Sequence, residues 1–154
     1  MKKLRITEWI LLFVYIIILI DFTLLDDAFG RNIFNIQNFT YDSFVNYIDD
    51  SLNLIPFFTV NLYINGVAQD KISVAYFIIN IFGNLIMLMP LTYFLPRIFK
   101  GIKGFFKLLI ALILFSVAIE ILQLVFLTGS CDIDDVILNV TGAAIAYPIL
   151  KNIN

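Results

Sequence analysis

The sequence contains no histidine, one cysteine and few charged side chains. Of its 154 residues, 14% are charged and 61% are hydrophobic. The lack of histidine excludes Ser–His and Cys–His catalysis and every His-ligated metal site. The single cysteine, Cys131, cannot form a disulfide within the chain. The net charge is −2 and no basic patch is present, so nothing indicates a nucleic-acid partner.

Apolar residues are what the chain has in excess. Soluble domains contain about 45–50% apolar and about 25% charged residues, so this composition indicates a chain surrounded by lipid. Four apolar segments approach the length of about 20 residues that a helix needs to cross a bilayer. They cover residues 9–25, 72–95, 105–127 and 133–150. We expect an all-α integral membrane protein with one domain over residues 1–154. Its bundle of four transmembrane helices would carry a long extracytoplasmic loop, residues 26–71, between the first two helices.

The first apolar segment also fits a signal peptide, because basic residues precede it. Asp26 and Asp27 follow where the small residues of a cleavage site would stand. We therefore expect an uncleaved first helix.

Basic residues are distributed unequally between the two sides of the predicted bundle. Only Arg31 and Lys71 lie in the loop 26–71, which also contains six Asp. The other basic residues flank the opposite helix ends: Lys2, Lys3, Arg5, Arg97, Lys100, Lys103, Lys107 and Lys151. Short loops rich in Lys and Arg stay in the cytoplasm. We therefore predict a multi-pass protein with both termini cytoplasmic.

The outer loop carries local patterns of its own. Four apolar residues recur at helical spacing: Tyr41, Phe44, Val45 and Ile48. They predict a short amphipathic helix, lying in the headgroup region or packed on the protein's own loop. Pro56 favours an extended Ile55. The pair Asn65–Gly66 predicts a turn.

Polar residues are placed at similar depth in the predicted helices, given a rise of about 1.5 Å per residue. The outer halves contain Asp21, Asn80, Asn84, Glu120, Gln123, Asp132, Asp135 and Asn139. A charged side chain that faces lipid costs about 2.5 kcal/mol or considerably more. We therefore expect these residues to line a polar pocket that opens outward. Asp134 should point the opposite way, into water or headgroups.

Structural interpretations of the same residues are also open. Asn and Gln often join membrane helices by hydrogen bonds that contribute about 0.6 kcal/mol. Asp132, Asp134 and Asp135 fit the N-terminal cap of the fourth helix. The depth of Glu120 has no such explanation and favours a functional role. Small residues are expected to allow close helix packing: Gly83, Gly142, Ala143 and Ala146.

Four motifs resemble those of the VanZ-like family of small bacterial membrane proteins. They are "NLIPFFT", "FGNLIMLMPLTYFLP", "EILQL" and "DIDDVILNVTGAAIAY", in the family's order from Asn53 onward. The resemblance implies a protein of the bacterial plasma membrane and cell envelope, associated with resistance to the glycopeptide teicoplanin. It supplies no established reaction. It adds Asn53, Pro56 and Phe57 to the ligand candidates.

Three functions remain open. The first is binding or shielding of a lipid-linked cell-wall precursor, or reduced access of a lipoglycopeptide to it. The second is a membrane enzyme that acts on a lipid headgroup, in which Glu120, Asp132 and Asp135 hold a divalent cation or act as acid and base. The third is a small transporter. No cofactor other than such a cation is indicated, and no residue is assigned a catalytic role.

Overall fold

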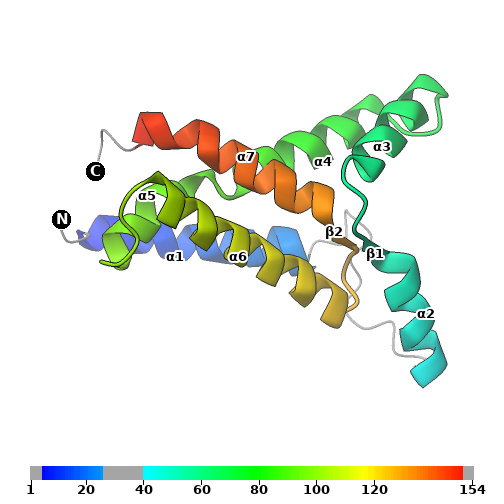
Figure 1. The fold of residues 1–154 in the computed structure, drawn as a ribbon, viewed down its shortest axis with the longest axis horizontal. Helices are drawn as coiled ribbons and strands as arrows, with labels where there is room; N and C mark the ends of the chain where they lie inside the picture. Colours follow the sequence, from blue (N-terminus) through cyan, green and yellow to red (C-terminus); the bar gives the residue numbers. More distant parts are fainter. Residues whose placement is uncertain (1–4, 26–39, 151–154) are drawn as a thin grey trace.

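The computed structural model describes residues 5–25 and 40–150. Within these ranges, four helical segments are long and apolar enough to cross a membrane: Ile6–Leu24, Val74–Ile98, Phe105–Val125 and Ile133–Leu150. They correspond to the four predicted segments, which confirms the all-α membrane bundle. Helix α7 (Ile133–Leu150) packs against α4 (Val74–Met87), α5 (Met89–Ile98) and α6 (Phe105–Val125). The start of α1 (Ile6–Ile20) and the end of α7 lie at the same end of the bundle (Figure 1).

The second span is two helices, where the sequence predicted one over residues 72–95. Helix α4 ends at Met87 and α5 begins at Met89. Pro90 stands in the first turn of α5, where its missing N–H and its ring interrupt the hydrogen bonds to the preceding turn and favour a break. The hydroxyl of Tyr15 donates to the carbonyl oxygen of Met87 at 2.9 Å, which satisfies a backbone acceptor at the break.

Helices α4 and α7 meet at Gly142. A Cβ atom there would lie 1.6 Å from the carbonyl oxygen of Leu85, so only glycine allows this approach. Ala143 and Ala146 are buried beside it on α7. The predicted packing role of these small residues is confirmed, and it follows the use of small residues at membrane helix contacts.

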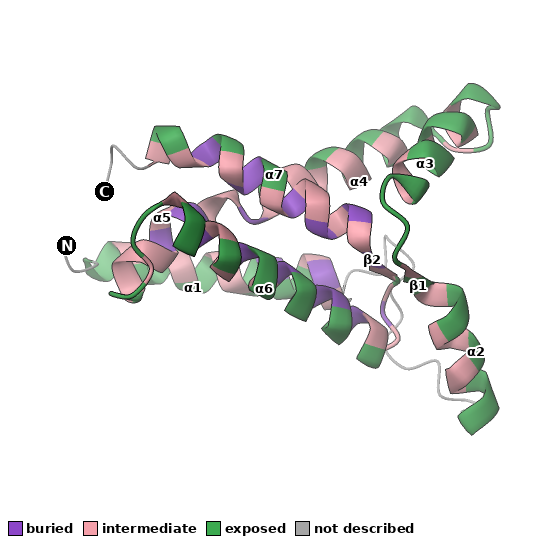
Figure 2. Ribbon diagram, viewed as in Figure 1, coloured by how far each residue is buried: buried purple, intermediate pink, exposed green. Residues whose placement is uncertain are grey.

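Buried residues occur at both ends of the bundle (Figure 2), and the two ends differ in the kind of residue that is buried. We call the end with α5, the start of α6 and the end of α7 the apolar end. Its buried residues are largely aliphatic, including Leu88, Leu91 and Leu108. We call the end with the π-helical turn η1 (Asp21–Leu25), the end of α6 and the start of α7 the polar end. There the buried side chains include Glu120, Gln123, Asp132 and Asp134.

The predicted outer loop is partly helical. The amphipathic pattern forms helix α2 (Tyr41–Ser51), and the side chain of its N-cap residue, Thr40, accepts a hydrogen bond from the N–H of Ser43. Strand β1 (Leu52–Asn53) and helix α3 (Phe58–Ala68) follow. Helices α2 and α3 diverge from one another at the polar end (Figure 1). Asp26, Asp27 and Arg31 lie outside the described residues.

The turn predicted at Asn65–Gly66 is wrong, because both residues lie inside α3. The chain reverses a few residues later, and the carbonyl oxygen of Gly66 accepts hydrogen bonds from the N–H groups of Lys71 and Ile72. A Cβ atom at Gly66 would lie 2.5 Å from Cδ1 of Ile72. The absence of a side chain at Gly66 allows Ile72 to pack closely against α3.

Candidate functional site

A short parallel strand pair joins two distant motifs at the polar end. Strand β1 pairs with β2 (Cys131–Asp132), with Asn53 opposite Asp132. The amide of Asn53 donates to Asp132 Oδ1 at 3.2 Å and to Thr59 Oγ1 at 3.0 Å. We call residues 53–60 the strap, because they lie over the start of α7. The strap contains three ligand candidates: Asn53, Pro56 and Phe57.

Asp132 is a cap and an anchor for the strap. Its Oδ1 accepts a hydrogen bond from the N–H of Asp134 at 2.8 Å, as the cap of α7 would, so the capping interpretation is confirmed for Asp132. Its Oδ2 accepts a hydrogen bond from the hydroxyl of Thr59. Its own N–H donates to Glu120 Oε2 at 3.0 Å. Asp132 therefore connects α6, α7 and the strap.

Asp134 does not face water or headgroups, as the helical pattern predicted. It is 1% exposed. Its Oδ1 accepts from the N–H of Phe57 at 2.5 Å, and its Oδ2 accepts from the N–H of Val60 at 3.1 Å. Phe57 has a φ of 64°, a strained value for a bulky residue that these bonds help to hold. The prediction failed because the strap covers this side of α7, and helical periodicity alone gives no information on such a cover.

Side-chain amides connect the helices below this cap. Asn84 Nδ2 donates to Asp135 Oδ1 at 2.5 Å, which joins α4 to α7. Asn139 Nδ2 donates to Ser116 Oγ at 3.1 Å, which joins α7 to α6. Gln123 Nε2 donates to the carbonyl oxygen of Thr23 at 3.0 Å, which joins α6 to η1. The predicted polar layer thus consists of several interhelical contacts. Asp21, also placed in that layer, is exposed.

The buried amide of Asn139 is only partly satisfied. Its Oδ1 has no hydrogen-bond partner among the described residues, and the side chain is 1% exposed. A buried acceptor without a partner costs about 1–3 kcal/mol. Water or a ligand group at this depth would remove that cost.

A polar cavity of about 320 Å³ lies beside these contacts. Three of the predicted candidates line it, namely Asn80, Gln123 and Asp135, whereas Glu120, Asp132 and Asn139 do not. Helix α2, helix α3 and the turn after α6 supply the other walls. The full lining is Tyr47, Ser51, Tyr63, Tyr76, Asn80, Gln123, Leu127, Thr128, Gly129, Ser130 and Asp135.

Three tyrosines of this lining were not predicted from the sequence. The hydroxyl of Tyr47 donates to the carbonyl oxygen of Gly129 at 2.5 Å. Tyr63 and Tyr76 meet edge to face, with ring centroids 5.9 Å apart. Burial, and next the nearby Tyr76 and Asp135, raise the pKa of Tyr63, so its hydroxyl stays neutral and able to donate. The one sequence signal for these tyrosines is that they lie in the predicted outer loop or at the outer end of the second span.

The chemistry of the site is poor in reactive groups. Burial, followed by the Glu120 and Asp132 carboxylates, raises the pKa of the Cys131 thiol, the opposite of what a nucleophilic cysteine needs. Within residues 5–25 and 40–150, no three His, Cys, Asp or Glu side chains are grouped as a metal site requires. Glu120, Asp132 and Asp135 are accordingly not assembled as a cation site. Both carboxylate oxygens of Asp132 already accept hydrogen bonds from protein donors.

The sequence model of the VanZ/LLP1 family matches residues 12–154. The chain belongs to the VanZ/LLP1 family. No curated protein and no solved structure matches it. The resemblance drawn from the four motifs is therefore confirmed. In this VanZ/LLP1 protein the first motif forms the strap and the last forms β2 and α7, so two segments separated by more than seventy residues hold one another.

Proposed function

We propose that this VanZ/LLP1 protein binds a lipid-linked component of the bacterial cell envelope at its polar end and shields it on the outer face of the plasma membrane. The observation that supports this most is the polar cavity, which lies at the end of the bundle away from the Lys/Arg-rich loop. The positive-inside rule puts that end outside. Ligand sites of this kind need a concave surface and a few placed polar groups, which Asn80, Gln123 and Asp135 supply.

Binding fits the side chains better than catalysis. The carboxylates of Asp132 and Asp134 accept hydrogen bonds from backbone and side-chain donors, and they cap the N-termini of α7 and α3 in this way. A general acid or base has to exchange its proton with a substrate, and a capping carboxylate is held away from that task. The raised pKa of the Cys131 thiol argues against covalent catalysis.

The family resemblance connects this site to teicoplanin. The acyl tail of that drug holds it at the outer leaflet, close to the proposed opening of the cavity. Expression of the protein in a teicoplanin-sensitive Gram-positive host should lower susceptibility to teicoplanin more than to vancomycin. Unchanged susceptibility, with normal amounts of protein in the membrane, would refute the proposal.

Four variants separate a role of the cavity from general folding. Asp135→Asn removes the charge from the cavity wall and should reduce protection. Glu120→Gln keeps the shape below the strap and removes only its charge, and Asn139→Leu replaces the partly satisfied amide. Leu112→Ala, in the apolar end, controls for loss of stability. If Leu112→Ala reduces protection as strongly as Asp135→Asn at equal protein levels, the cavity is structural.

A further inference from the structure

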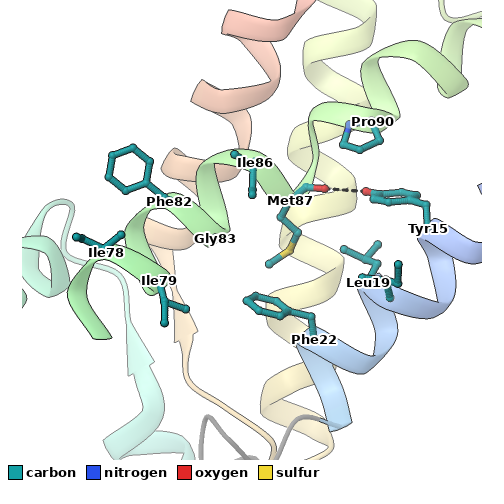
Figure 3. A pocket seen from close by; sticks show the side chains of 11 residues that line it. Tyr15, Leu19, Phe22, Ile78, Ile79, Phe82, Gly83, Ile86, Met87 and Pro90 are labelled. Carbon is teal, nitrogen blue, oxygen red and sulfur yellow. Dashed lines mark hydrogen bonds between the residues drawn. The ribbon is translucent and has the colours of Figure 1, made fainter. Parts of the chain in front are cut away.

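An apolar groove of about 480 Å³ lies between α1 and α4 (Figure 3). Residues of α1, η1 and α4 face each other across it, among them Tyr15, Leu19, Phe22, Ile79 and Met87. Both walls belong to candidate membrane spans. Hydrocarbon is the solvent on this side of the bundle, so a lipid chain is the natural occupant.

Glycine leaves space in the groove at the point where α4 approaches Phe22. A Cβ atom at Gly83 would lie 3.3 Å from Cζ of Phe22, tighter than an ordinary contact. A larger side chain at Gly83 would therefore enter the space between the two helices. A substitution at Gly83 is therefore a way to fill the groove from α4.

Residues of the groove and of the polar cavity are adjacent along two chain segments. Phe22 lines the groove, and the carbonyl oxygen of the next residue, Thr23, accepts a hydrogen bond from Gln123 of the cavity wall. Ile79 lines the groove, and the next residue, Asn80, lines the cavity. A hydrocarbon-lined space and a polar space therefore border the same two segments of the chain, an arrangement that suits the two parts of an amphiphile.

The cavity wall indicates which headgroup fits. It combines tyrosine rings with amide and carboxylate groups, which suit a sugar because the rings cover its C–H faces and the polar groups bind its hydroxyls. The residues known to line it include the Asp135 carboxylate and no Lys or Arg. An anionic phosphate at the same place would be repelled by that charge.

We propose that the cavity and the groove form one site for an uncharged glycolipid, with the sugar headgroup in the cavity and one hydrocarbon chain between α1 and α4. This inference rests on the proposed function, whose ligand class it names. The groove accepts hydrocarbon of many kinds, and the cavity selects the sugar.

The test uses the full chain in phosphatidylcholine nanodiscs that contain equal amounts of monoglucosyl diacylglycerol and phosphatidylglycerol with the same acyl chains. Native mass spectrometry then counts the lipids retained by the protein. We expect retention of the glucolipid to exceed that of phosphatidylglycerol about tenfold, which corresponds to about 1.4 kcal/mol. Equal retention, or a preference for phosphatidylglycerol, overturns the inference.

Variants test each half of the site. Asn80→Leu should bring the two lipids to nearly equal retention, and Gly83→Leu should lower retention of the glucolipid itself. Ile79→Trp fills the same groove if Gly83→Leu does not fold. Leu114→Ala, on an exposed face of α6, should change neither. If Asn80→Leu keeps the glucolipid preference and a folded groove-filling variant retains as much glucolipid as the wild type, the lipid lies elsewhere and the inference is overturned.

The two proposals fail in different ways. Protection from teicoplanin without any sugar preference overturns the glycolipid site and leaves shielding intact. A clear sugar preference without protection overturns the shielding function and leaves the glycolipid site intact.

Discussion

The polar and apolar ends of the bundle are held together by different forces. At the apolar end, buried aliphatic residues such as Leu88 and Leu112 form one cluster with Ala143 of α7, next to Gly142, whose backbone contacts α4. At the polar end, Glu120, Asp132 and Asp134 are buried and accept hydrogen bonds from backbone N–H groups. Burying carboxylates is expensive, and close packing of small and aliphatic residues is available to the same helices. This difference supports the proposal that the polar end serves a ligand as well as the packing of the bundle.

The largest loss of stability is expected from a change at the packing contact between α4 and α7. Gly142→Ala places a methyl group on the backbone of Leu85, which forces α4 and α7 apart. Overpacking typically lowers the free energy of unfolding by about 1–3 kcal/mol. For a clash with backbone we expect a loss of about 3 kcal/mol or more. Thermal unfolding in detergent measures the loss. Gly101→Ala is the matched control, because no atom lies within 4 Å of its added Cβ; equal melting of the two variants would contradict the packing account.

A smaller and more local effect is expected at the polar end. Asp134→Ala leaves the N–H groups of Phe57 and Val60 without their acceptor. Such a loss costs about 1–3 kcal/mol. The strap should then loosen, and limited proteolysis should cut within residues 53–60 before the helices unfold. Asp49→Ala, at an exposed position of α2, supplies the control. If the strap of Asp134→Ala resists protease as well as that of the control, the buried carboxylate does not hold it.

The smallest effect concerns the reactivity of Cys131. Because its pKa is raised, less thiolate is present at a given pH, and alkylation should rise at higher pH than for an exposed thiol. Glu120→Gln removes one of the charges that raise the pKa, so it should move the curve to lower pH. The measurement is the alkylation rate against pH, with Asp49→Cys in a Cys131→Ser background as the exposed thiol. Coincident curves for Cys131 and the exposed thiol would show that the polar end does not perturb it.

The sequence predicted the spans and the burial of polar residues for physical reasons that act locally. Helix length, apolar composition and the cost of charge in lipid depend on each segment alone. The spans and the burial of Glu120 and Gln123 could therefore be predicted from the sequence. The broken second span follows from Pro90, a local signal that the apolar composition hid.

The cap over α7 was not predictable in the same way. Asp134 is buried because the strap, more than seventy residues earlier, folds back over it, and the pairing of Asn53 with Asp132 fixes that return. Long-range contacts of this kind leave no periodic pattern in either segment. The tyrosines of the cavity were missed for the same reason, since α2, α3 and α4 bring them together only in the fold.

The central claim, that the polar end is the outer, ligand-binding end, is tested most directly by cysteine accessibility in intact cells. In a Cys131→Ser background, Asp49→Cys on α2 should react with a membrane-impermeant maleimide. Lys100→Cys, in the loop between α5 and α6, should react only after the membrane is permeabilised. The reverse pattern would place the polar cavity in the cytoplasm and contradict both its outward opening and the shielding function.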